Sequence, residues 1–129
     1  MKLSEAIRLG AMATEHVTHV YMIINADGSI GTCAIGSALY AVGQYLRGYA
    51  VRNYLIMRWR WLSGSHLVQC HACGCRAHVM ETIIHLNDHH LWSRERIAYW
   101  VSMIEPQEQV LLEDQREEQP AREYTEVTQ

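Results

Sequence analysis

The chain has 129 residues, the size of one ordinary domain, and 49% of them are hydrophobic, which is enough for one core and too little for two. No apolar run approaches the roughly 20 residues that a membrane-spanning helix needs. Glu5 and Arg8 precede any long apolar stretch, which is the wrong order for a signal peptide. We therefore expect no membrane span and a soluble protein that stays in the cytoplasm.

The net charge of −3 is distributed unevenly along the chain. From Glu105 to the end there are eight acids against two arginines, whereas residues 1–104 carry nine bases and six acids, which leaves +3. This change of composition predicts one domain over residues 1–106 and an acidic polar tail over residues 107–129, part of which is helical. Such a tail is typical of a solvated segment, and it suits a partner protein or a second copy of the chain.

The first third of the chain predicts a helix, a strand and a turn. Apolar residues recur at helical spacing over residues 3–13, with Ser4 as the N-cap and Glu5 in the first turn. Residues 17–24 are β-branched and apolar, which is typical of a strand, and an Asp-Gly turn follows within residues 25–29.

The middle of the chain predicts a second helix and a second strand. Thr32 is placed to cap a helix from residue 33 to about residue 46. Residues 57–62 alternate between arginine and apolar side chains with a period of two, which favours a half-buried strand.

The last third predicts two helices joined by a loop. The first helix covers residues 80–87, and the second begins after an N-cap at Ser93 and continues to about residue 104. Together, these elements predict an α+β fold, a small and mainly helical domain with short strands or a β-hairpin.

Two cysteines and a group of histidines have the spacing of a zinc site. Cys70 and Cys73 are separated by two residues, and His85 follows after eleven more, ahead of His89 and His90. Zn²⁺ takes four N or S ligands in a tetrahedron, and a Cys-x2-Cys turn followed by a helix with two histidines supplies them. Closely spaced cysteines in a cytoplasmic chain indicate a metal before a disulfide.

The spacing leaves the fourth ligand open. His89 lies one helical turn after His85 on the same face, whereas His90 requires the helix to end and the chain to turn back. Cys75 and His78 are competing ligands.

Four protein ligands close the coordination sphere, so the pattern favours a structural Zn²⁺ ion, because a catalytic one needs an open position. If one histidine were not a ligand, a water would take its place, and Glu81 and Asp88 would be the nearest candidate bases.

Four segments of the chain stand out as motifs: LSEAIRLG at residues 3–10, TCAIGSAL at 32–39, IHLND at 84–88 and WSRERIA at 92–98. With them it resembles small uncharacterised proteins of phages and bacteria that carry a Cys-Ala-Leu-Gly-Ala-Leu helix. A subset of these has a Cys-x2-Cys-Gly knuckle before a His-Leu-Asn-Asp-x-His-x-Trp stretch. The resemblance covers most of residues 3–104, but not the arginine–aromatic segment.

The resemblance implies a fold and a metal site, and it implies no activity. On the motif of the subset, the positions that match the ligands are Cys70, Cys73, His85 and His90. A phage-encoded member would act in the host cytoplasm.

Cys33 is a candidate nucleophile. It begins a predicted helix, where free amides and the helix dipole lower the pKa of a thiol, as in cysteine hydrolases. His85 or His66, with Asn87 as the orienting group, would complete a triad. The alternative is a small buried residue that packs against the first helix.

Arginines interleaved with aromatic residues between positions 45 and 61 form the composition that binds single-stranded nucleic acid. The candidate contacts are Arg52, Arg58, Trp59, Arg60 and Trp61. A charge of only +3 on the body makes the long-range attraction weak. In the alternative interpretation the tryptophans pack on the zinc module and the arginines face solvent.

The closed metal site, the acidic tail and the lack of a convincing catalytic set predict a zinc-stabilised accessory or adaptor protein that acts by binding another protein or by self-association. Nucleic-acid binding through residues 45–61 and hydrolysis by Cys33 are the alternatives.

Overall fold

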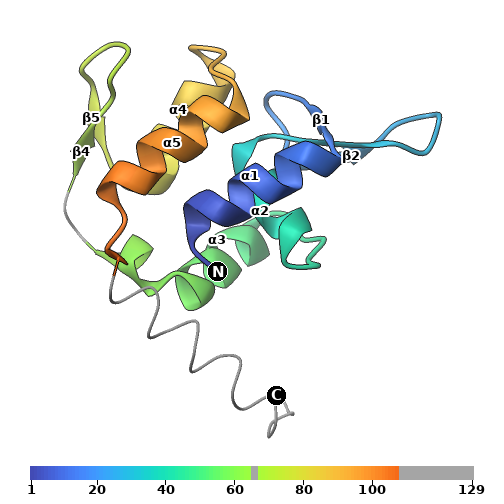
Figure 1. Cartoon of the computed structure of the whole chain (residues 1–129), viewed down its shortest axis with the longest axis horizontal. Helices are drawn as coiled ribbons and strands as arrows, with labels where there is room; N and C mark the ends of the chain where they lie inside the picture. Colours follow the sequence, from blue (N-terminus) through green and yellow to red (C-terminus); the bar gives the residue numbers. More distant parts are fainter. Residues whose placement is uncertain (65–66, 108–129) are drawn as a thin grey trace, which may run out of the picture.

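The computed structural model describes residues 1–64 and 67–107 and has the α+β fold that the sequence predicts (Figure 1). Over these residues the helices are α1 (Leu3–Ala13), α2 (Ala34–Ala41), α3 (Tyr49–Arg58), the 3-10 helix η1 (Arg60–Ser63), α4 (Val79–Asp88) and α5 (Arg94–Ile104). The strands are β1 (Glu15–His16), β2 (Met22–Ile24), β3 (Ile30–Thr32), β4 (Val68–Gln69) and β5 (Arg76–Ala77). None of these helices is long and apolar enough to cross a lipid bilayer.

Helix α1 packs against both α2 and α5, and the three helices form the centre of the core (Figure 1). Leu3 and Ile7 of α1 are fully buried, as are Ile35 and Leu39 of α2 and Ile97 of α5. The predicted helix over residues 3–13 is thus confirmed, and its apolar stripe is the face that meets α2 and α5.

Two glycines bring the backbones of neighbouring elements into contact. A Cβ on Gly10 of α1 would lie 1.8 Å from the carbonyl oxygen of Ser37 in α2. A Cβ on Gly36 of α2 would lie 1.7 Å from the carbonyl oxygen of Tyr21, just before β2. Any larger residue at either position would force these elements apart, so both glycines fix the position of α2.

A buried arginine joins the three-helix core to the sheet. Arg94 at the start of α5 donates to the hydroxyls of Thr14, Thr32 and Ser37 at 2.7, 3.0 and 3.2 Å. It also donates to the carbonyl oxygen of Ala11, in the last turn of α1, at 3.2 Å and to that of Thr14, just after the helix, at 3.0 Å. Burial lowers the pKa of Arg94 from its usual value. The residue pattern does not indicate this role, because an arginine in a first helical turn is normally exposed.

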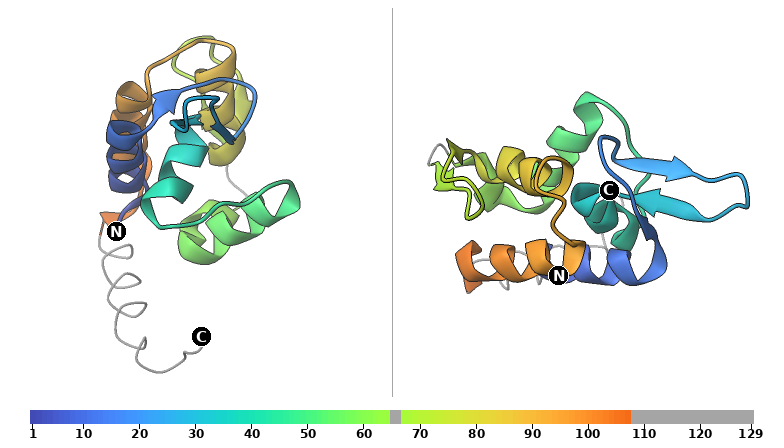
Figure 2. Two further views of the ribbon diagram at one scale, coloured as in Figure 1. Left: turned by 90° about the vertical axis from the view of Figure 1, so that its right-hand side faces the viewer. Right: turned by 90° about the horizontal axis from the view of Figure 1, so that it is seen from above.

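The larger sheet has the strand order β1-β3-β2, with β1 parallel and β2 antiparallel to β3. The hairpin of β2 and β3 projects from the helical body (Figure 2). Its turn is the predicted one, in which Gly28 has φ +88° and donates its N–H to the carbonyl oxygen of Asn25. The predicted strand over residues 17–24 is reduced to Met22–Ile24, because the chain bends at His19, which has φ +70°.

Asn87 in the last turn of α4 ties the sheet to α2. Its Oδ1 accepts from the backbone N–H of Ala34 at 3.1 Å and lies 2.7 Å from His16 Nε2. Its Nδ2 donates to the carbonyl oxygen of Val17 at 3.1 Å. Next to it, Asp88 Oδ1 accepts from the backbone N–H of His19 at 2.9 Å. The end of α4 therefore holds the segment that leads into β2.

Both predicted N-caps of the first two helices are wrong. Lys2 is the N-cap of α1, while Ser4 is buried and donates its backbone N–H and its hydroxyl to the carboxylate of Glu105. The negative charge complements the N-terminal end of the helix dipole. Cys33, rather than Thr32, is the N-cap of α2, and its Sγ accepts from the backbone N–H of a residue three positions later.

The helix predicted from residue 33 to about residue 46 ends at Ala41, and Gly43 with φ +76° follows it. The strand predicted at residues 57–62 is wrong, because α3 and η1 occupy this segment. Trp59 joins the two helices, and it is buried with its Nε1–H donated to the carbonyl oxygen of Met1 at 3.0 Å. Tertiary packing of this tryptophan overrides the alternating pattern.

The two C-terminal helices are confirmed. α4 extends one residue beyond the predicted range at each end, and α5 starts after Ser93, whose hydroxyl accepts from the backbone N–H of Arg96 at 3.1 Å. The predicted boundary at residue 106 stays a prediction, because residues 108–129 of the expected tail lie outside the described residues.

Candidate metal centre

The β4–β5 hairpin carries the two cysteines of the predicted zinc site. The backbone N–H of Cys70 donates to the carbonyl oxygen of Cys75 at 2.8 Å, and the N–H of Gly74 donates back to Cys70 at 2.8 Å. Gly74 has φ +79°, a conformation that residues with a Cβ rarely adopt. The resulting tight turn places Cys70 and Cys73 on the same side of the hairpin.

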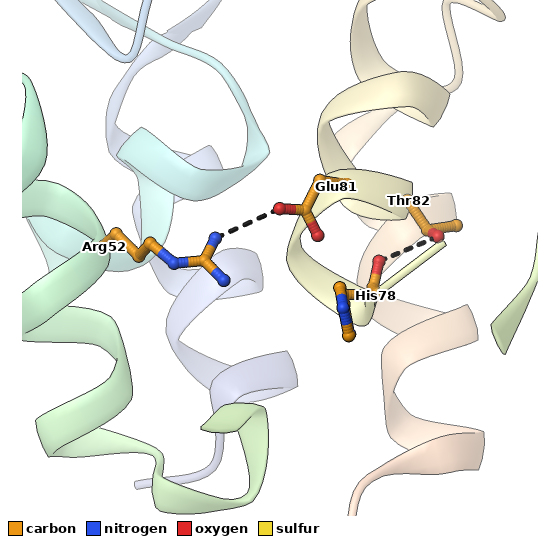
Figure 3. Close-up of polar contacts among 4 residues, drawn as sticks. All are labelled: Arg52, His78, Glu81 and Thr82. Atoms are coloured by element: carbon orange, nitrogen blue, oxygen red, sulfur yellow. Dashed lines mark hydrogen bonds and ion pairs between the residues drawn. The ribbon is translucent and has the colours of Figure 1, made fainter. Parts of the chain in front are cut away.

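Helix α4 supplies His85, and its first turn carries two polar contacts (Figure 3). The hydroxyl of Thr82 donates to the carbonyl oxygen of His78 at 3.0 Å, and Arg52 of α3 forms an ion pair with Glu81 at 3.1 Å. Buried Ile83 on the opposite side of the helix anchors α4 to the core. The last turn of the helix is thereby directed at the hairpin.

The chain turns back on itself just after α4. The backbone N–H of His90 donates to the carbonyl oxygen of His85 at 3.3 Å, and that of Trp92 donates to Leu86 at 3.0 Å. Leu91 between them has φ +55°, which is uncommon for a residue other than glycine. The reversal brings the ring of His90 against that of His85, with ring centroids 4.6 Å apart.

The hairpin and the helix end bring four donor atoms together. One ligand atom each from Cys70, Cys73, His85 and His90 lies within 4.8 Å of all the others. The Nε2 atoms of the two histidines are 3.1 Å apart, and Cys73 Sγ is 3.4 Å from His85 Nε2. A tetrahedral zinc with ordinary bond lengths requires roughly 3.3 Å between two nitrogens and roughly 3.5 Å between nitrogen and sulfur. The group therefore has the donors and the spacing to hold one metal ion.

The surroundings of the cluster favour a neutral imidazole on α4. Desolvation, and then the neighbouring rings of His90 and His89, lower the pKa of His85. A metal ion binds the neutral form of imidazole. Cys70 is only 2% exposed, whereas Cys73 lies at the surface, so the cluster has one buried side and one side open to solvent.

The competing ligands lie outside this cluster. His89 stacks edge-on against His19, with ring centroids 6.2 Å apart, and lies beside His85 at 5.1 Å. Cys75 and His78 are not among the residues whose donor atoms converge. Helical spacing pointed to His89, but the chain reversal brings in the next residue instead, and that residue is the one that the family resemblance aligned.

The candidate bases near the cluster are already engaged. Glu81 pairs with Arg52, and Asp88 accepts from Asn87 Nδ2 at 2.8 Å as well as from His19. A cavity of about 180 Å³ borders the cluster between the hairpin and α4. Glu81 lines this cavity together with Cys70 and His85, and its carboxylate is paired with Arg52. The arrangement fits a metal ion held by four protein ligands.

Cys33 does not have the environment of a nucleophile. It lies at the N-terminus of α2 as predicted, but it is 4% exposed, and burial raises the pKa of its thiol to about 11. Desolvation thus outweighs the hydrogen bond from Gly36. The expected lowering of the pKa is wrong. The amide of Asn87 is committed to Ala34 and Val17, and His66 lies outside the described residues.

The arginine–aromatic segment buries part of its aromatic surface. Trp59 is buried, Trp61 is half-buried, and Arg58 lies over the ring of Trp59 at 5.6 Å. Arg52 is paired with Glu81, as described above, and Arg60 is exposed. With its largest ring in the core, the segment offers less stacking surface than its composition suggests.

No protein-family model, no curated protein and no solved structure matches the chain. The resemblance to phage and bacterial proteins therefore stays a prediction.

Proposed function

We propose that Cys70, Cys73, His85 and His90 bind one structural Zn²⁺ ion, and that the protein acts as a small adaptor that binds another protein. The observation that supports a metal ion is the convergence of two sulfur and two nitrogen donors at tetrahedral spacing. This donor set is the one that structural zinc sites prefer. Four protein ligands leave no position for a substrate, which supports a structural role over a catalytic one.

The hairpin needs such an ion because it has almost no core of its own. Its strands are two residues long each, and between residues 67 and 78 only Cys70 is buried. A two-stranded hairpin is at best marginally stable in water. Metal binding contributes directly to folding where ligands would otherwise be free, so zinc takes the place of apolar packing here.

Binding to a partner is supported by the surface around β2. Six large apolar side chains are exposed there or on the adjoining segments, namely Val20, Ile23, Ile24, Tyr40, Tyr45 and Tyr49. Grouped exposed apolar residues are typical of interaction sites. The residues between His85 and His90 hold the segment before β2, so the ion supports this surface indirectly. An accessory role in a host cytoplasm agrees with the family resemblance and is part of the proposal.

Elemental analysis of the purified full chain tests the metal. We expect one zinc per chain, lost in Cys73→Ser and His90→Ala and retained in the matched variants Cys75→Ser and His89→Ala. Equal zinc in all four variants, or none in the parent chain, would contradict the assignment.

Affinity capture tests the adaptor role. We expect a defined partner that the parent chain captures from lysate and that Ile24→Asp does not. Met103→Asp is the control, because Met103 is an exposed apolar residue on α5 and is not among the residues that line the grooves along β2. Loss of the partner in both variants, or in neither, would count against this surface.

A further inference from the structure

Strand β2 is the edge of the larger sheet, and half of its backbone groups face away from β3. The register pairs Ile23 with Gly31, and the flanking bonds join Cys33 N–H to Tyr21 and Asn25 N–H to the carbonyl of Ser29. Hydrogen-bonded pairs alternate along an antiparallel ladder. The N–H and C=O groups of Met22 and Ile24 therefore point to the open edge.

The edge of β2 is short, at three residues, but it has none of the charged residues or prolines that usually protect an exposed strand. Natural proteins place charged residues or proline on edge strands, or cover them with another element. β2 reads Met-Ile-Ile, and Ile24 is 61% exposed. An apolar edge of this kind presents unpaired backbone groups on which another strand can pair.

A groove runs along this edge. It has a volume of about 520 Å³ and lies between residues 20–24 on one side and residues 45–48 on the other. This volume is within the range of roughly 300–1,000 Å³ that ligand sites occupy. Because residues 45–48 form the opposite wall, the groove suits a single extended chain better than the edge of a second sheet.

A second, apolar groove adjoins the first. It has a volume of about 450 Å³ and shares Met22, Ile24 and Tyr45 with the first, and Ile30 and Tyr40 complete its apolar lining. Side chains of an added strand alternate between the two faces of the sheet. Every second residue of the occupant would therefore contact this apolar lining.

The edge groove also contains a positive charge, which favours an acidic residue in whatever binds there. Arg47 is the charged residue among those that line the edge groove, and its guanidinium lies 5.8 Å from the centre of the Tyr45 ring. Within residues 1–64 and 67–107, no carboxylate lies within ion-pair distance of Arg47. A carboxylate on the occupant could therefore pair with Arg47 without displacing another acid.

We propose that an extended segment of a partner protein, with alternating apolar residues and an acidic residue opposite Arg47, adds to β2 as a further strand. This proposal rests on the proposed adaptor function and specifies its mode of recognition. Backbone hydrogen bonds to Met22 and Ile24 supply affinity, and the apolar groove and Arg47 supply specificity, as in other cases of β-strand addition.

The probe is a random library of linear peptides, selected on the zinc-loaded full chain. We expect enriched peptides to alternate apolar residues with others and to contain Asp or Glu. Their affinities are then measured by fluorescence anisotropy against variants of the protein. Enrichment of helical or basic sequences, or no enrichment, would overturn the proposal.

The variant Ile24→Pro tests whether a peptide binds through backbone hydrogen bonds to β2 or only through apolar contacts. Ile24→Pro removes an outward N–H but no bond to β3, and proline is tolerated at such edge positions. We expect at least about tenfold weaker peptide binding, against a smaller loss in Ile24→Ala, which keeps the N–H. Circular dichroism and zinc content serve as checks that both variants fold.

Arg47→Glu provides the charge test. We expect it to weaken the enriched acidic peptide and to restore binding when the acid of the peptide is replaced by lysine. If neither Arg47→Glu nor Ile24→Pro changes the affinity, strand addition is overturned.

The outcomes also distinguish this proposal from the adaptor function itself. Loss of the captured partner in Ile24→Asp without loss in Ile24→Pro would retain the adaptor surface and overturn strand addition. If sedimentation shows a dimer that Ile24→Pro abolishes, β2 pairs with a second copy, and the peptide proposal is again overturned.

Discussion

In the core of α1, α2 and α5, residues such as Leu3, Ile7 and Leu39 are fully buried, whereas between residues 67 and 78 the only buried residue is Cys70. The first region is held by apolar packing over three helices. The second consists of two very short strands beside a cluster of metal donors. The same chain thus combines a part that folds through burial with a part that requires a ligand, and the two respond to different perturbations.

Removal of the metal should have the largest effect, and it should separate the two regions. With a strong chelator we expect residues 67–78 and 85–90 to lose protection from amide exchange, while α1, α2 and α5 stay protected. Apparent zinc-binding energies in zinc-finger peptides are about 10–16 kcal/mol, far more than so short a hairpin gains by packing. Hydrogen exchange with mass spectrometry measures this. Uniform loss of protection across the chain would show that the regions do not fold separately.

Gly10→Ala should destabilise the core of α1, α2 and α5. Helix propensity alone predicts stabilisation of up to about 1 kcal/mol, because alanine is the better helix former. The contact with Ser37 predicts the opposite, a loss of about 3 kcal/mol, since a Cβ at 1.8 Å from a backbone oxygen forces α1 and α2 apart. Urea unfolding followed by circular dichroism gives the sign. Zinc content should not change, because no donor lies on these helices.

Asn87→Ala tests the connection between the two regions. It leaves the N–H of Ala34 and the carbonyl of Val17 without their partner, at a cost of about 2–4 kcal/mol for groups that are largely buried. We expect a lower urea midpoint and faster amide exchange before β2, with zinc still bound. Asp88→Asn is the control, because an amide oxygen still accepts from the N–H of His19. An equal loss in the two variants would argue against a specific role of Asn87.

The same contrast explains how far the sequence predicts the structure. Apolar periodicity predicts α1, α4 and α5 correctly, because the apolar stripes of these helices face one core. The Cys-x2-Cys spacing predicts the cysteine turn, because the spacing of metal ligands is a local property of the sequence. Periodicity failed at residues 57–62, where Trp59 is buried and donates a hydrogen bond to the carbonyl oxygen of Met1, far away in the chain. The choice of His90 over His89 depends on a backbone reversal at Leu91, which helical spacing does not contain.

The structural roles of Arg94 and Asn87 could not be predicted from the sequence for a related reason. Each makes several bonds to backbone and side-chain groups that are distant in sequence, so their roles exist only once the fold has formed. The expected reactivity of Cys33 failed because the sequence shows the start of a helix but does not show that the thiol is buried there.

Cys33 gives the core a measurable dependence on pH. The pKa of its thiol is raised from 9.0 to about 11 in the folded protein. The protonated thiol is favoured by folding, so this contribution is complete below about pH 9 and is lost as the pH rises toward 11. Relative to Cys33→Ser, which keeps a good N-cap and does not titrate in this range, the parent chain should lose about 2 kcal/mol over this interval. Urea unfolding at fixed zinc concentration measures the difference, and parallel pH curves for the two proteins would contradict the raised pKa.

Arg52→Ala should have the smallest effect, although its ion pair with Glu81 joins α3 to α4, the helix that carries His85. Both side chains are nearly half exposed, and solvent screens exposed pairs so that they contribute less than about 1 kcal/mol. We expect unchanged zinc content and a small fall in stability that disappears at high salt. Buried Ile83 and the hydrogen bonds of Asn87 fix α4 without the pair. Zinc loss in Arg52→Ala would mean that the metal centre depends on a surface contact, so that the hairpin and α4 would not be positioned by packing and metal alone.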